Sequence, residues 1–159
     1  KMKKEALLSE INSCQEFFER STRVLEEKDS SFMPSDGMLT AAQQMAHVAQ
    51  TIHWFIQGAF SPEGFDMDFE AHIAEYSKAT SITAERESLK KAYAAAISRI
   101  ASLTDDELAK PIAEGPVMGG APRYHAFIGL IDHTAHHRGS LAVYARLLNK
   151  VPLMPYMEM

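Results

Sequence analysis

The sequence contains one cysteine, Cys14, and no long apolar run. A single cysteine cannot form an internal disulfide bond, which is typical of a protein from a reducing compartment. No segment reaches the roughly 18 consecutive apolar residues that a membrane span requires. The basic start, Lys1 to Lys4, leads into amphipathic sequence and lacks the apolar core of a signal peptide. We therefore expect a cytoplasmic protein that has no membrane partner.

The chain also lacks an excess of positive charge. Its 16 Lys and Arg residues face 21 Asp and Glu residues, so the formal net charge is −5. The basic residues are scattered and form no patch that would attract phosphate groups, and we expect no nucleic-acid partner. An apolar content of 46% with 23% charged residues is ordinary for a globular protein, and 159 residues suit one core. We expect a single domain, residues 1–159.

Strand-like alternation and repeats of a fixed period are absent from the sequence. Instead, apolar residues recur at steps of three and four in four long segments, which is the pattern of amphipathic helices. These segments span about residues 3–28, 39–59, 81–103 and 127–149. Shorter helices are expected around residues 69–76 and after the capping-box sequence that begins at Thr104. The predicted fold class is all-α, a four-helix bundle with short extra helices in the connections.

The last long segment contains the sequence His133-Thr-Ala-His136-His137-Arg138-Gly139. His133 and His137 are one helical turn apart on its apolar side, with about 5–6 Å between their Cβ atoms. Two neutral imidazoles at this spacing can bind one divalent ion, but they can equally form a polar patch in a helical core. A third metal ligand must come from another part of the chain.

His47 lies at the centre of the second long segment. Its neighbours on the helical wheel include more polar side chains than a plain core face would hold. These neighbours are Gln43, Gln44, Gln50, Thr51, Trp54 and Gly58. Such a face suits a lined cavity, and bundles build sites from side chains on facing helices, so His47 can meet His133 and His137. By itself, His47 is more typical of a core histidine with a hydrogen-bond partner.

The helix order and the placement of these histidines resemble the DinB-like metal-binding four-helix bundles, also called DNA-damage-inducible or bacillithiol-transferase-like proteins. The matching pieces are His47-Val-Ala-Gln-Thr-Ile-His-Trp54, Asp132-His133-Thr-Ala-His136-His137-Arg138-Gly139, and the tail from Val151 to Tyr156. The resemblance implies that His47, His133 and His137 are the three metal ligands and that His136 lies outside the ligand set. It also implies a homodimer.

The activity that the resemblance implies is thiol transfer, because relatives include S-transferases that use bacillithiol or mycothiol. The expected ligands are a divalent metal ion, zinc or nickel before iron or manganese, a low-molecular-weight thiol and a small-molecule substrate. Three protein ligands leave coordination positions open for water or substrate. Two alternatives stay open: a metal-dependent hydrolase, and a bundle that binds a metal or small ligand without turnover.

The chain departs from the family pattern at three positions. Thr134 and Gln50 stand where relatives often have acidic residues, and Ser140 stands where glutamine is common. Residues around metal ligands orient the imidazoles and tune the ion, so these changes bear on reactivity more than on binding. They leave open a scaffold that has lost catalysis.

Other side chains are expected around the ion or along its pocket. These are Gln50, Thr51, Trp54, His136, Arg138, Tyr144 and Tyr156. Gln50 and Tyr156 are candidates to orient a substrate, whereas Tyr144 is more typical of core packing. Cys14 lies on an apolar stripe and is expected to be a small buried side chain and no nucleophile. His72 is expected at the surface.

Overall fold

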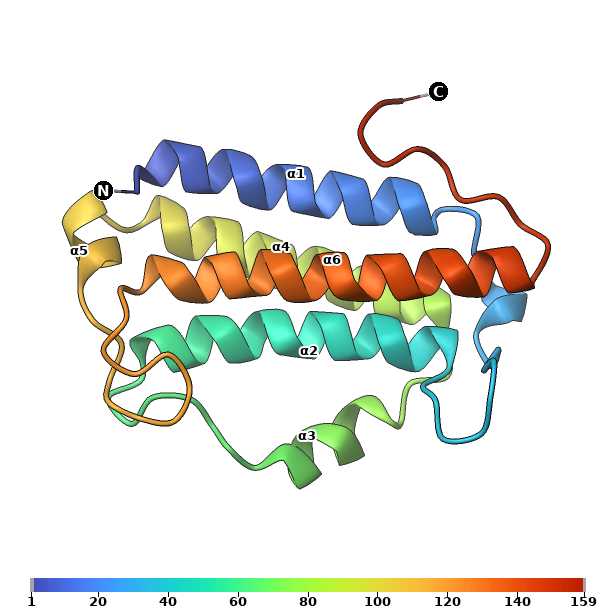
Figure 1. Cartoon of the computed structure of the whole chain (residues 1–159), viewed down its shortest axis with the longest axis horizontal. Helices are drawn as coiled ribbons and strands as arrows, with labels where there is room; N and C mark the ends of the chain where they lie inside the picture. Colours follow the sequence, from blue (N-terminus) through green and yellow to red (C-terminus); the bar gives the residue numbers. More distant parts are fainter. Residues whose placement is uncertain (1, 159) are drawn as a thin grey trace.

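The computed structural model describes residues 2–158 and shows that the described part of the chain folds into helices joined by loops (Figure 1). The helices are α1 (Lys4–Thr22), the 3₁₀ turn η1 (Glu27–Asp29), α2 (Ala41–Phe60), α3 (Phe69–Tyr76), α4 (Ile82–Ala101), α5 (Asp105–Ala109) and α6 (Tyr124–Leu147). The four long helices α1, α2, α4 and α6 form a bundle, and α3 and α5 lie in its connections. The predicted fold class is confirmed.

The order of the helices around the bundle brings α2 beside α6. The helices α1 and α6 run in one direction and α2 and α4 in the other (Figure 1). Neighbouring helices pack as α1 with α4, α4 with α2, α2 with α6, and α6 with α1. A long crossover, residues 61–81, runs back along the outside of α2 and carries α3 (Figure 1). The middle of α2 therefore faces α6 on one side and α3 on another.

Side-chain caps fix where these helices begin. Oγ1 of Thr40 accepts a hydrogen bond from the backbone N–H of Gln43, and the backbone N–H of Thr40 donates to Oε1 of Gln43, which completes a capping box at the start of α2. Ser81 caps α4, and Thr104 with Glu107 forms a second capping box at α5. The capping box that the sequence predicts at Thr104 is confirmed.

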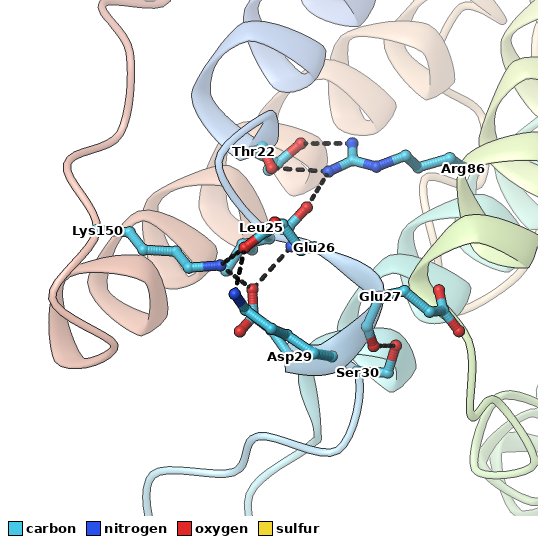
Figure 2. Close-up of polar contacts among 9 residues, drawn as sticks. Thr22, Leu25, Glu26, Glu27, Asp29, Ser30, Arg86 and Lys150 are labelled. Carbon is cyan, nitrogen blue, oxygen red and sulfur yellow. Dashed lines mark hydrogen bonds and ion pairs between the residues drawn. The ribbon is translucent and has the colours of Figure 1, made fainter.

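The first helix is shorter than expected, because α1 ends at Thr22 and the chain then turns through η1. The guanidinium of Arg86, on α4, donates hydrogen bonds to the backbone oxygens of Thr22 at 2.8 Å and Leu25 at 3.0 Å (Figure 2). Carbonyl groups at the end of a helix need such donors once the backbone stops supplying them. Arg86 therefore stabilises the end of α1 against α4.

The segment after α6 is joined to the same corner of the bundle. Lys150 contacts the carboxylates of Glu26, at 2.7 Å, and Asp29, and Asp29 also accepts the backbone N–H of Glu26 at 2.7 Å (Figure 2). Hydrogen bonding to Lys150 lowers the pKa of the Glu26 carboxyl to about 2. Further on, Arg20 donates to the backbone oxygen of Pro155 at 3.0 Å, so the tail lies against α1.

The core combines large side chains with small ones where α2 meets α4. Alanines on both helices, including Ala42 and Ala92, are completely buried and allow the two backbones to approach closely. Phe18, Tyr93 and Phe127 fill the centre. No helix within residues 2–158 combines the length and the hydropathy that a membrane span requires.

Candidate metal centre

Three imidazoles from two helices converge on the side of the bundle where α2 faces α6. His47 comes from α2, and His133 and His137 come from α6. The Nε2 atoms of His47 and His133 are 3.1 Å apart, and the ring centroid of His137 lies 4.8 Å from that of His47. Ligand atoms of all three rings lie within 4.8 Å of one another. The antiparallel packing of α2 on α6 therefore completes the pair of histidines that one helix supplies.

Hydrogen bonds to the other ring nitrogens orient two of these imidazoles. The Nδ1–H of His137 donates to Oε1 of Gln44 at 2.6 Å, and Nδ1 of His47 lies 3.4 Å from Oγ1 of Thr51. A donated Nδ1–H leaves the Nε2 lone pair as the free ligand atom. Gln44 and Thr51 both come from α2, one turn before and one turn after His47. Gln44 therefore leaves the Nε2 lone pair of His137 free to bind an ion, and Thr51 contacts the ring of His47.

The surroundings keep the three imidazoles uncharged. Burial, together with the smaller effect of the neighbouring histidines, lowers the pKa of His133 to about 4 and that of His137 to about 3. Burial also lowers the pKa of His47. Near neutral pH each ring therefore carries a lone pair that is available to a cation.

The donor set fits a divalent transition-metal ion. Nitrogens at 2.0–2.1 Å from a tetrahedral zinc ion are about 3.3 Å apart, close to the 3.1 Å between His47 and His133. Neutral imidazoles suit zinc, nickel, iron and copper, whereas magnesium and calcium take oxygen ligands. His47, His133 and His137 together can bind a metal ion.

A pocket of about 380 Å³ opens beside the imidazoles, between α2 and α3. His47 and His133 form one end of it, and most of its other lining side chains are apolar or aromatic. The lining residues are His47, Gln50, Thr51, Trp54, Phe55, Phe69, His72, Ile73, Tyr76 and His133. This volume lies within the range of about 300–1,000 Å³ that is typical of small-molecule pockets. The arrangement joins a candidate metal centre to a cavity that can hold a small organic molecule.

Comparison with known proteins identifies the family of the chain. The sequence profile of the DinB superfamily matches residues 12–141, which include all three histidines. The chain belongs to the DinB superfamily. No curated protein is significantly similar to it in sequence.

Solved structures share the DinB fold at low sequence identity. A DinB-like protein from Bacillus cereus ATCC 10987 is 19% identical with a TM-score of 0.64, over 94% of this chain and 96% of that chain. A DinB-like protein from Bacillus subtilis is 17% identical with a TM-score of 0.62, over 97% and 99%. An uncharacterized protein from Clostridium difficile 630 is 15% identical with a TM-score of 0.74, over 93% and 98%. At these identities the similarity establishes the fold alone.

Several predicted pocket residues of this DinB protein do lie at the site. Gln50, Thr51 and Trp54 line the pocket beside the imidazoles. His136 is exposed, and its ring packs against that of His137 with 4.9 Å between centroids. Tyr144 is buried and donates to the backbone oxygen of Leu39 at 2.7 Å, which agrees with a role in core packing.

Arg138 and Tyr156 lie elsewhere, against α1. The Arg138 guanidinium is 5.7 Å from the ring centres of both Phe17 and Tyr156, and the two rings pack edge to face. Tyr156 and Arg138 line a smaller cavity of about 140 Å³ together with Cys14. This placement differs from our expectation that Tyr156 orients a substrate, because Tyr156 does not line the pocket beside the imidazoles.

Cys14 has the environment of a structural thiol. The side chain is buried, Sγ lies 3.9 Å from the hydroxyl of Tyr93, and burial raises the pKa of the thiol. A thiol with a raised pKa is a weak nucleophile. The expectation that Cys14 takes no part in chemistry agrees with this environment.

Two residues of the site were not predicted. Gln44 was noted only as a neighbour of His47, and nothing in the sequence indicates that it reaches His137 on another helix. His72 was expected at the surface, but α3 folds over α2, so His72 lines the pocket and its Nε2 atom is buried. The position of Gln44, one turn before His47 on a buried helix face, is the only sequence signal that it belongs to the site. No sequence signal places His72 there.

Proposed function

We propose that this DinB protein holds a divalent metal ion, zinc or nickel before iron or manganese, on His47, His133 and His137. We further propose that it is a metal-dependent thiol S-transferase, which joins a low-molecular-weight thiol to a small electrophile. The observation that carries the proposal is the convergence of three uncharged imidazoles, two of which, those of His47 and His133, line a largely apolar pocket.

The ion and the protein side chains have different roles in the proposed reaction. A divalent ion with open coordination positions acidifies a thiol or a water molecule that binds to it. The chain's own side chains hold the ion, and Gln44 keeps His137 in the tautomer that binds it. The pocket walls exclude water from the electrophile. In the net reaction a carbon–sulfur bond forms, the bond to the leaving group breaks with its electron pair, and the thiol proton passes to solvent.

An external thiol is required, because the protein's own thiol is remote from the pocket. Cys14 is buried against Tyr93 and lines a different cavity from that of the imidazoles. Hydrolysis is the weaker alternative, since a hydrolytic zinc site commonly uses a carboxylate as general base. The lining residues of the pocket include no carboxylate, and Gln50 occupies the position where relatives often have one.

The test is an assay with 1-chloro-2,4-dinitrobenzene as the model electrophile. Protein loaded with zinc, nickel, iron or manganese is incubated with a panel of low-molecular-weight thiols. Thiol-dependent consumption that is lost in His137→Ala but kept in Cys14→Ala is the expected result. Consumption of an activated ester without thiol supports a hydrolase instead. No turnover with any thiol or metal supports a metal-binding bundle without enzymatic activity.

A further inference from the structure

The pocket between α2 and α3 combines aromatic and apolar walls with histidines, an amide and a hydroxyl. Trp54 and Phe55 come from α2, and Phe69, Ile73 and Tyr76 come from α3. No Lys, Arg, Asp or Glu is among its lining residues. A charged ligand group buried there would lose its hydration without gaining an ion pair, whereas an apolar group gains from burial. The walls therefore favour an uncharged ligand group.

The aromatic walls continue directly into the imidazole cluster. The ring centroid of Tyr76 lies 4.6 Å from that of His47, and the ring of Phe55 lies 6.5 Å from that of His133. Trp54 packs against Phe55 on α2. It also faces Phe69 on α3, with 6.3 Å between the ring centroids of Trp54 and Phe69. Flat rings on both sides of a cavity favour a flat occupant, because stacked and edge-to-face contacts add to simple burial. Such an occupant would have one end against His47 and His133.

The face of α3 that borders the pocket is incompletely covered by the protein itself. None of the side chains of α3 is buried, and Phe69 and Ile73 are each 50% exposed. These two residues are four positions apart and so share one face of the helix. Exposed apolar side chains that line a concave surface are typical of a ligand-binding groove. A ligand would cover the surface that the fold leaves open.

Two sets of hydrogen bonds hold α3 in place over α2. At one end the indole N–H of Trp54 donates to the backbone oxygen of Asp66 at 2.7 Å, and Asp66 Oδ1 accepts from the N–H of Asp68 at 2.9 Å. Asp68 in turn caps α3 through the N–H of Ala71. At the other end the side chain of Gln43 donates to the backbone oxygen of Ser77 at 3.0 Å. The pocket is therefore formed before a ligand arrives, which lowers the ordering cost of binding.

We propose that this pocket binds the uncharged aromatic group of an electrophilic substrate, and that Phe69 and Ile73 of α3 set this preference. This proposal rests on the proposed function only in that the bound aromatic molecule is a substrate. Binding of an aromatic molecule to the pocket needs neither thiol nor turnover, so it is measured separately.

Trp54 supplies the readout, because it is the only tryptophan of the chain and lines the pocket. Chelator-treated protein, in which no ion can bind a carboxylate, is titrated with nitrobenzene, and its tryptophan fluorescence is followed; 4-nitrobenzoate, which adds a carboxylate to the same ring, is the matched charged compound. We expect saturable quenching by nitrobenzene and at least tenfold weaker binding of 4-nitrobenzoate. Saturable quenching by nitrobenzene is also expected with zinc-loaded protein. Quenching that rises linearly without saturation, or equal affinity for the two compounds, overturns the proposal.

The role of α3 is tested with the double variant Phe69→Ala/Ile73→Ala. Both side chains are half exposed, so their truncation leaves the bundle core intact, which circular dichroism and the melting temperature check. We expect at least tenfold weaker nitrobenzene binding with unchanged zinc content. Val143→Ala, which truncates a comparably exposed apolar residue of α6 outside the pocket, is expected to bind within twofold of the parent. Equal affinity of the double variant and the parent overturns the assignment to α3.

The two proposals fail in different ways. Saturable, zinc-independent binding of nitrobenzene without thiol transfer to any electrophile removes the transferase and leaves the aromatic pocket. Thiol transfer to 1-chloro-2,4-dinitrobenzene without saturable nitrobenzene binding removes the aromatic pocket and leaves the transferase. Where both hold, the double variant is expected to raise KM at least tenfold for 1-chloro-2,4-dinitrobenzene and to leave KM for iodoacetamide, a small electrophile without a ring, within twofold.

Discussion

The side chain of Gln44 on α2 accepts a hydrogen bond of 2.6 Å from Nδ1 of His137 on α6. Both residues are buried, so this bond is shielded from water. It fixes the tautomer of His137 and ties a candidate metal ligand to the helix that carries His47. Partners of this kind are worth about 10–100-fold in metal affinity.

Replacing Gln44 is therefore expected to weaken metal binding without removing a ligand. Gln44→Leu leaves the Nδ1–H of His137 without an acceptor, and we expect about 10–100-fold weaker zinc binding and a loss of about 1–3 kcal/mol in the unfolding free energy. Gln44→Glu keeps an acceptor and is expected to retain affinity. Competition with a chromogenic chelator measures both. Gln57→Leu changes an exposed glutamine of α2 and is the matched control; equal affinities for Gln44→Leu and this control contradict the role of Gln44.

Replacing a ligand is expected to remove the metal and its stabilising effect. An ion that binds only the folded state adds about 4 kcal/mol when its free concentration is about 1,000 times Kd. His47→Ala, His133→Ala and His137→Ala are each expected to lose the metal in elemental analysis and to melt at a lower temperature in metal-replete buffer. His125→Ala, an exposed histidine of α6, is expected to change neither quantity. Full metal content in His47→Ala would contradict the three-histidine site.

The helices and the pair His133 and His137 could be predicted from local sequence, whereas His47 was assigned as the third ligand from the family resemblance. Period and caps define α2, α4 and α5, and the spacing of His133 and His137 places both on one side of α6. The end of α1 was predicted too far along the chain. The helix ends at Thr22 because Arg86, 64 positions later, donates a hydrogen bond to the backbone oxygen of Thr22. A contact over that distance has no local signal.

The pocket could not be predicted from the sequence, because it depends on where the short helix α3 lies. The existence of α3 follows from its sequence, but its position over α2 depends on the hydrogen bond from Trp54 to Asp66 and on Gln43 reaching Ser77. His72 was therefore assigned to the surface. Tyr156 was assigned to the site from resemblance, whereas the tail lies against α1. The homodimer and the cytoplasmic location stay predictions.

The contact of Lys150 with Asp29 is expected to stabilise the corner where α6 ends. The Asp29 carboxylate is only 5% exposed, so Lys150→Met leaves a nearly buried acceptor group with fewer donors (Figure 2). We expect a loss of about 1–3 kcal/mol in urea unfolding at pH 7. Lys90→Met breaks an exposed pair with Glu87 and is expected to leave the unfolding free energy almost unchanged. A similar loss in both variants would show that the Lys150 contact is no stronger than a surface ion pair.

Binding to DNA is expected to be absent, although the family carries the name DNA-damage-inducible. The net charge of −5 repels the phosphate backbone, and the basic residues form no stripe. Gel-shift experiments at physiological salt are expected to show only weak, non-specific association. A shifted band at low protein concentration that persists when salt is added would contradict this expectation.

The stability of the metal-free protein is expected to fall as the pH falls below about 6.5. The pKa values of His133 and His137 are lowered to about 4 and about 3 in the folded chain, mainly by burial, and that of His47 is also lowered. In the unfolded chain each imidazole titrates near pH 6.5. Between these values the unfolded state binds protons that the folded state does not, so the imidazoles favour unfolding increasingly toward pH 4.

Urea unfolding of chelator-treated protein between pH 7.5 and pH 4 measures this dependence. His133→Phe replaces one buried imidazole by an apolar ring of similar shape and is expected to lose less stability over the same interval. His125→Ala removes an exposed histidine and is expected to follow the parent protein. The comparison isolates the imidazole from the carboxylates, which titrate in all three proteins alike. Identical pH profiles for the parent and His133→Phe would mean that the folded-state pKa of His133 is not lowered, and that a proton competes with the metal at neutral pH.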